Sequence, residues 1–466
     1  MKSFKHFILY AGLVLVFGGL IFYLLKLGGY SGRDFTLPKH MPTRVPDGLD
    51  VFLNSFRKNL QDSLSRLLLQ IILIIASTRL LGEVFKKIGQ PAVVGETIAG
   101  IILGPSLLGL LFPGVFHFIF PADSLPNLRF LSQIGLILFM FIVGIELDTR
   151  LLRKQAFEAV IISHASILIP FSLGVFLSLY LYPYYANQQG GFYPFALFMG
   201  IAMSITAFPV LARIIQDRKL TGTKLGVLAI GAAASDDVTA WCMLAILVAM
   251  IRSGYDMNGM FMIVIVILYV FIMLLPVRII LKKILALYEN KKIGYHSLAG
   301  IFFTMLLCSA WCTEVIGIHA LFGAFLAGII LPKNDELQKK ITNQISDLTL
   351  IMLLPLFFVY TGLRMQVAIL QKPNLWIAFV LILICAVAGK FGGSSLTARA
   401  LGQTWKDSLR IGALMNTRGL MELIVLNIGY DMGILSIEIF SMMVLMALLT
   451  TMMTSPILNW IDRWRG

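Results

Sequence analysis

Two adjacent carboxylates lie in the middle of one of the longest apolar stretches of this chain. The segment ASDDVTAW, residues 234–241, places Asp236 and Asp237 between GVLAIGAA and CMLAILVAM. A charge in the interior of a membrane costs at least about 2.5 kcal/mol, so charges that stay there need a partner or a role. Two neighbouring carboxylates in a low-dielectric site also disfavour each other's ionisation. One of them can therefore hold either a proton or a small cation, and this competition is sufficient for exchange.

A single lysine is the best candidate partner for this pair. Lys390, in the sequence AGKFGG, is the only lysine at a comparable depth in an apolar stretch, and its small neighbours let another helix approach closely. Successive helical residues point about 100° apart, so the two aspartates can address different partners. We predict that Asp236 is held by Lys390 and that Asp237 exchanges, with Ser235, Thr239 and Thr206 as neutral oxygen ligands. A purely structural Asp236–Lys390 pair would leave Asp237 unexplained.

Two other apolar stretches are interrupted by polar residues. The interruptions are SITAFP, which contains Thr206, Ala207 and Pro209, and NTRG, which contains Asn416, Thr417 and Arg418. Proline lacks a backbone donor and clashes with the preceding helical turn. We predict two broken helices that cross, because opposed helix ends and freed backbone groups can hold an ion at that depth. The alternative is an ordinary proline kink and a misplaced loop boundary.

Two glutamates within apolar stretches are further candidates for this region. Glu422 follows Arg418 by four residues, and Glu96 lies in an earlier stretch. Either could pair with Arg418 for charge compensation or line a cavity, and an ion pair of this kind is structural as readily as functional.

The elements that position these residues are membrane helices. The chain has 466 residues, 58% of them hydrophobic and 13% charged, with a mean hydropathy of +0.87. Apolar runs of about 20 residues, long enough to cross a bilayer, recur along it. We predict an all-α polytopic membrane protein with fourteen spans. They lie near residues 7–27, 63–83, 91–112, 127–147, 156–183, 191–215, 223–251, 258–285, 296–312, 315–332, 347–363, 374–399, 407–430 and 437–460.

The distribution of lysine and arginine predicts the orientation. With the N-terminus inside, 25 of the 38 basic residues fall on the cytoplasmic side, as the positive-inside rule requires, and both termini are cytoplasmic. The net charge of +14 therefore reflects topology and gives no sign of nucleic-acid binding. The first span is expected to be an uncleaved anchor followed by an external loop. We expect an integral protein of a bacterial inner (plasma) membrane.

Two motifs repeat in the same order in the two halves of the chain. AGIILGP at 99–105 returns as AGIILP at 327–332, and Leu-Phe at 138–139 followed by Gly144 returns at 356–357 followed by Gly362. Seven crossings separate the first pair of copies, so an inverted repeat is predicted, the construction typical of secondary transporters. The expected organisation is an extra helix and loop over 1–60 and a cation/proton exchanger domain over 61–466. The latter comprises repeat 1 at 63–252, a linker helix at 258–285 and repeat 2 at 296–460.

Other functional classes find less support in the sequence. Motifs such as HExxH, GxSxG, a P-loop or GxGxxG before a helix are absent, so we expect no enzyme and no cofactor. An intramembrane aspartyl protease would need two aspartates on different helices. A gated conductance for monovalent cations, using the same polar site, remains the alternative to a cation/proton exchanger.

From about residue 63 to 460 the chain resembles the monovalent cation/proton antiporter-2 family of sodium/proton exchangers, and several stretches look most like the plant cation/H⁺ exchanger branch and its bacterial relatives. The matching stretches are GQPAVVGETIAGIILGPSLLG, LILFMFIVGIELD, SITAFPVLARII, ASDDVTAW, IGIHALFGAFLAGIILP, LPLFFVYTGLR and NTRGLMELIVLNIG. The resemblance implies a homodimer in which a mobile core domain carries Na⁺ or K⁺ in exchange for H⁺ by an elevator-like movement. It also implies that Asp237 binds the ion, that Asp236 faces Lys390, and that Thr206 and Asn416 lie at the crossing. Glutathione-gated potassium-efflux relatives differ, because they have Gln-Asp at the acidic pair and a cytosolic nucleotide-binding domain.

Overall fold

Every regular element in the described part of the chain is a helix, as the sequence predicts. The computed structural model describes residues 48–60, 62–146, 156–186, 191–220, 223–253, 257–332, 334–366 and 373–463. The chain separates into two units, 1–61 and 62–466, and the first unit contributes the helix α2 (Gly48–Leu60). The predicted first span at 7–27 and most of the loop after it lie outside the described residues.

Within the second unit, the helices form two groups and a connection between them. We name the first the glycine-packed group; it comprises α3 (Ser63–Lys87), α4 (Ala92–Leu103), α5 (Leu108–Leu111), α6 (Pro113–Ile119), α7 (Leu125–Glu146), α15 (Tyr295–Ile316), α16 (Ala320–Ile330), α17 (Asp335–Leu348), the π-helical turn η3 (Thr349–Leu353) and α18 (Leu354–Arg364). The connection comprises α13 (Met257–Ile272), a π-helical turn η2 (Met273–Val277) around Pro276, and α14 (Arg278–Glu289).

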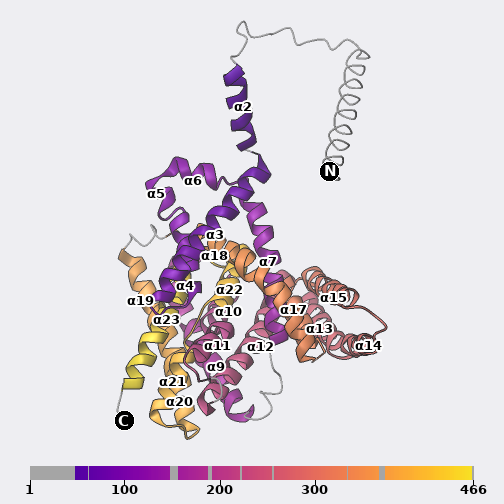
Figure 1. Cartoon of the computed structure of the whole chain (residues 1–466). Coiled ribbons are helices and arrows are strands. Elements are labelled where there is room, and N and C mark those ends of the chain that lie inside the picture. The colour runs from indigo at the N-terminus through magenta and orange to yellow at the C-terminus, as the bar shows by residue number, and fades with distance from the viewer. Residues whose placement is uncertain are drawn as a thin grey trace. The chain divides into compact units, whose positions relative to one another are not determined.

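The other set is the broken-helix group, which contains both predicted breaks. It comprises α9 (Ala156–Tyr185), α10 (Phe192–Ser204), α11 (Phe208–Asp217), α12 (Lys224–Ser253), α19 (Pro373–Val387), the π-helical turn η5 (Ala388–Gly392), α20 (Gly393–Ala400), α21 (Trp405–Met415), α22 (Leu420–Asp431) and α23 (Ile437–Arg463). The most extensive packing runs within each group, and α23 against α4 is a smaller contact between them. In Figure 1, α10, α11, α12 and α22 lie between α13–α15 on one side and α19 with α23 on the other.

Close glycine contacts hold the glycine-packed group together. A Cβ on Gly362 would lie 2.3 Å from the carbonyl carbon of Gly100, and a Cβ on Gly144 would lie 2.3 Å from the carbonyl oxygen of Phe325. A Cβ on Gly328 would likewise lie 2.3 Å from the carbonyl oxygen of Phe141. Helices α4 and α18 therefore touch backbone to backbone, as do α7 and α16. Each copy of the repeated AGII motif packs on the LF…G motif from the other predicted half.

The spans differ from the prediction at two places. The described residues contain eleven helices that are long and apolar enough to cross a membrane, together with the bent pair α21 and α22, which meet at 41°. The predicted span at 315–332 is only the 11-residue helix α16, which starts after a turn at Gly317 and His319. The predicted span at 347–363 is longer, because the polar segment 335–348 is the helix α17 and continues through η3 into α18. A helix satisfies its own backbone groups, so this polar segment stays helical with one face buried.

Candidate ion-binding site

The two predicted breaks lie against each other. Helix α10 ends at Ser204, the chain is extended at Ile205, and α11 starts at Phe208. The second break separates α21 from α22, and the N-cap Thr404, whose hydroxyl accepts a hydrogen bond from the Asp407 N–H at 3.1 Å, fixes the start of α21. Across the two breaks, the backbone N–H of Ala207 donates to the carbonyl oxygen of Thr417 at 3.0 Å. The regular hydrogen bonds of both interrupted helices therefore stop at the same place, where the two breaks meet.

Asp236 and Lys390 form a fully buried ion pair beside this crossing. Lys390 Nζ lies 2.8 Å from Asp236 Oδ2, and both side chains have no exposed surface. The Thr206 hydroxyl lies 2.7 Å from the same carboxylate oxygen and 2.6 Å from Nζ. Ser163 donates to Asp236 Oδ1 at 2.6 Å, and Ser166 donates to Oδ2 at 3.1 Å while accepting from Nζ at 2.8 Å. Every charge of the pair is therefore satisfied by the protein, which a buried ion pair requires.

The backbone around Lys390 explains how a lysine reaches this depth. Lys390 lies in the π-helical turn η5, a distortion that often marks functional sites. A Cβ on the preceding Gly389 would lie 2.8 Å from the Cα of Pro170 in α9. Because glycine leaves this space open, α9 approaches the turn closely and brings Ser166 to the ammonium group and Ser163 to the Asp236 carboxylate.

Asp237 has very different surroundings from its neighbour. Its side chain is 1% exposed, and neither carboxylate oxygen has a hydrogen-bond partner. The backbone N–H of Phe208, at the start of α11, is close enough to interact with the carboxylate electrostatically. The fully buried Asn416, at the end of α21, also leaves both its amide oxygen and its amide nitrogen unpaired. Since α12 packs on both α11 and α21, these unpaired polar side chains lie on helices that meet around the crossing.

Arg418 lies at the crossing and contacts the C-terminal end of α10. Its guanidinium donates to the carbonyl oxygens of Ala202 at 3.0 Å and Met203 at 2.7 Å, in the last turn of α10. It also pairs with Glu422 at 3.1 Å, and both side chains are fully buried. A cation at a helix C-terminus compensates the partial negative charge of its free carbonyls. Of the two candidate partners, Glu422 is therefore the one that pairs with Arg418, whereas Glu96 lies on α4 in the glycine-packed group.

The remaining candidate residues have more local contacts. Thr417 Oγ1 lies 3.2 Å from Thr454 Oγ1 of α23, and the Thr239 hydroxyl donates back to the carbonyl of Ser235 at 2.9 Å. Ser235 itself is half-buried on α12. Pro209 lies in the first turn of α11, where its missing N–H costs no hydrogen bond, so it begins a helix and does not interrupt one.

Two residues that contact the buried ion pair were not identified from the sequence. Ser163 and Ser166 were not predicted, although their spacing of three places them on one face of a helix. Thr206 was predicted as an ion ligand with Asp237, and in the structure its hydroxyl contacts Asp236 and Lys390. A serine pair in an apolar helix is a weak signal, because each hydroxyl can instead bond the carbonyl one turn back.

The fold and the site together define an integral membrane protein with crossed broken helices around buried carboxylates, the arrangement of ion-coupled transporters. The chain belongs to the sodium/hydrogen exchanger family, whose transmembrane region matches residues 48–461. It is 45% identical to the Na⁺/H⁺ antiporter NhaS4 of Synechocystis sp. over 397 residues, which cover 85% of this chain and 97% of that protein.

Longer relatives match the same part of the chain, and a solved structure shares its fold. The chain is 39% identical to cation/H⁺ antiporter 17 of Arabidopsis thaliana and 32% identical to K⁺/H⁺ antiporter 1 of Saccharomyces cerevisiae. The matches cover 85% and 87% of this chain, which spans about half of each relative, 48% and 47%. The structure of the sodium proton antiporter MjNhaP1 from Methanocaldococcus jannaschii has the same fold, with a TM-score of 0.61 and 16% identity, over 85% of this chain and 99% of that one.

Proposed function

We propose that this protein exchanges a monovalent cation, Na⁺ or K⁺, for protons by alternating access, and that Asp237 binds either the cation or a proton. The observation that carries the proposal is the contrast within the acidic pair. Asp236 has a lysine and three hydroxyl groups, whereas Asp237, one residue on, is equally buried and has no hydrogen-bond partner. A buried carboxylate without a partner is costly as an anion, so it favours binding a proton or a cation.

In the proposed cycle, Asp237 alternates between a protonated state and a cation-bound state. With a proton, the carboxyl group is neutral and the buried site carries no unpaired charge. When the proton leaves, a monovalent cation replaces it, and the Asn416 amide oxygen together with backbone carbonyls freed at the breaks supplies further oxygen ligands. Because the two ligands compete for one carboxylate, each must leave before the other binds, which couples the two flows.

The number of protons per cation depends on Lys390 in this proposal. If the Asp236–Lys390 pair stays intact through the cycle, one proton is exchanged per cation and transport is electroneutral. If the lysine gives up its proton when the cation binds, two protons are exchanged and transport carries charge. Transport is measured at a clamped membrane potential with Na⁺ and K⁺ in turn. Whether the rate depends on the potential distinguishes the two stoichiometries, and comparison of the two rates identifies the transported ion.

Cation-driven proton movement in proteoliposomes tests the function. Reconstituted protein should collapse an imposed pH gradient when Na⁺ or K⁺ is added, and Asp237→Asn should abolish this response. Glu83→Gln, which removes an exposed pair with Lys86 on α3, is the matched control and should transport normally. Cation currents that do not move protons would instead identify a gated conductance and contradict the proposal.

We further propose that the protein is a homodimer in a bacterial plasma membrane, with both termini cytoplasmic, and serves pH homeostasis. Exposed apolar side chains along α3, such as Leu64, Leu68, Ile72 and Leu80, support a surface that meets lipid or a second copy. Cross-linking in native membranes and antibody access to tags at either end test the dimer and the orientation.

A further inference from the structure

The two helix groups are joined by ion pairs at one end of the bundle. Asp431, the last residue of α22 in the broken-helix group, pairs with two arginines of the glycine-packed group. Its Oδ2 lies 3.0 Å from Arg129 near the start of α7, and its Oδ1 lies 2.7 Å from Arg364 at the end of α18. A single carboxylate thus bonds two helices of the opposite group, one through each oxygen.

A second layer of bonds lies one turn deeper along α22. The Asn427 side chain accepts a hydrogen bond from Arg364 at 3.1 Å and donates one to the Thr361 hydroxyl at 2.8 Å. The Arg364 guanidinium also lies over the rings of Tyr360, at 4.5 Å, and Tyr430, at 5.3 Å, one from each group. Arg364 is therefore the common element of an ion pair, a hydrogen bond and two cation–π contacts, three of which cross from α18 to α22.

The positions of the two arginines are unusual for this sequence. On the predicted orientation, four basic residues beyond the first loop are external: Arg129, Arg252, Arg364 and Lys372. The positive-inside rule disfavours such positions, so those that occur need a local reason. Two of the four, Arg129 and Arg364, contact the same aspartate.

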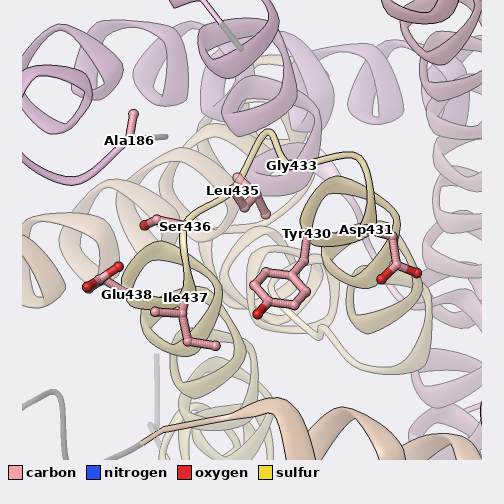
Figure 2. A pocket seen from close by; sticks show the side chains of 8 residues that line it. All are labelled: Ala186, Tyr430, Asp431, Gly433, Leu435, Ser436, Ile437 and Glu438. Carbon is pink, nitrogen blue, oxygen red and sulfur yellow. The ribbon is translucent and has the colours of Figure 1, made fainter. Parts of the chain in front are cut away.

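Water reaches these bonds from the side. An open pocket of about 670 Å³ lies beside the turn between α22 and α23, and its lining includes Tyr430, Asp431, Ser436 and Glu438. Figure 2 shows the Tyr430 ring and the Asp431 carboxylate at the edge of this pocket, next to that turn. Because Asp431 is 25% exposed, its ion pairs can separate into water without burying an unpaired charge.

We infer that Asp431, Asn427, Arg129 and Arg364 form a latch, a set of bonds that holds the two helix groups together at this end of the bundle. The latch must open each time the proposed ion site becomes accessible from this end. The inference rests on the proposed alternating access, in which one helix group moves against the other. Bonds between the groups keep this end of the bundle closed. They can therefore be present only in the state of the cycle in which the ion site faces the opposite end. The latch residues do not bind the transported ion; they determine which end of the bundle is open.

A cross-link between the groups tests the latch. In a protein freed of its cysteines, Thr361→Cys and Asn427→Cys place one thiol on each group where the native side chains touch. Joining them with copper phenanthroline or a short bifunctional methanethiosulfonate should reduce exchange at least about fivefold, and dithiothreitol should restore it. The matched control is Arg66→Cys with Asp123→Cys, an ion pair of 3.3 Å within the glycine-packed group, whose cross-link should leave exchange unchanged. The native cysteines to be replaced by serine are Cys242, Cys308, Cys312 and Cys385.

Charge reversal provides a second and independent readout. Asp431→Arg places three cations together and should reduce exchange at least about fivefold, and adding Arg129→Asp with Arg364→Asp should restore most of it. Full exchange by the cross-linked Thr361/Asn427 protein, or a triple variant no better than Asp431→Arg alone, would overturn the latch. Exchange by the cysteine-free parent before cross-linking tests the proposed function separately.

Discussion

Asp236 and Asp237 are adjacent in α12, yet the first contacts Lys390 at 2.8 Å and the second has no hydrogen-bond partner. Their different surroundings follow from the helical rotation of about 100° per residue, which turns one carboxylate to α9 and η5 and the other away from them. The same helix thereby carries a fixed charge, neutralised by its neighbours, and a second carboxylate that is available to a ligand.

Removing one member of the Asp236–Lys390 pair should cost more than removing both. Lys390→Met leaves Asp236 buried without its counter-charge, and we expect a loss of about 3–5 kcal/mol in the free energy of unfolding. Asp236→Asn combined with Lys390→Met should recover most of this loss. Thermal unfolding of the purified variants in detergent measures both effects. A double variant as unstable as Lys390→Met alone would show that the pair is not the source of the stability.

Arg418→Lys should reduce transport while keeping the charge. Lysine cannot reach the carbonyl oxygens of Ala202 and Met203 and the Glu422 carboxylate together, because it lacks the planar fork of arginine. We expect the rate of exchange to fall at least about tenfold, with a stability loss of about 1–3 kcal/mol. Arg399→Lys, at an exposed position in α20, is the control and should behave like the parent. Normal transport by Arg418→Lys would indicate that charge alone matters at the crossing.

Glycine packing within the glycine-packed group predicts a sharp steric effect. Gly362→Ala would place a methyl group 2.3 Å from the backbone of Gly100, so α4 and α18 must separate, at a cost of about 1–3 kcal/mol. Gly300→Ala in α15 is the matched control, since nothing lies within 4 Å of its added Cβ, and it should be neutral or slightly stabilising. Thermal unfolding in detergent compares the two. Equal stability of both variants would contradict the close contact.

Competition at one carboxylate predicts how transport depends on pH. If Asp237 holds either a proton or a cation, a higher proton concentration must raise the cation concentration needed for half-maximal exchange. In the acid range we expect this concentration to rise by up to about tenfold per pH unit for one competing proton. Initial rates in proteoliposomes over a series of cation concentrations and pH values measure the slope. A half-maximal concentration that is independent of pH would exclude direct competition.

Much of the fold was predictable because bilayer thickness fixes the length of an apolar helix. The pairing of Asp236 with Lys390 was also predictable, since few charges occur at that depth and opposite signs attract. Ser163 and Ser166 were not predictable, because a serine in an apolar helix usually bonds its own backbone and its direction depends on helix packing. The span at 347–363 was predicted too short, because the polar segment 335–348 is an amphipathic helix that continues into it.

Proton release on cation binding tests the role of Asp237 most directly. Purified protein in weakly buffered detergent solution is titrated with Na⁺ or K⁺, and the released protons are measured with a pH dye. We expect cation binding to release protons from the parent protein and to release none from Asp237→Asn. Cation binding without proton release, or unchanged release from Asp237→Asn, would contradict the assignment of Asp237 as the carboxylate that exchanges a proton for a cation.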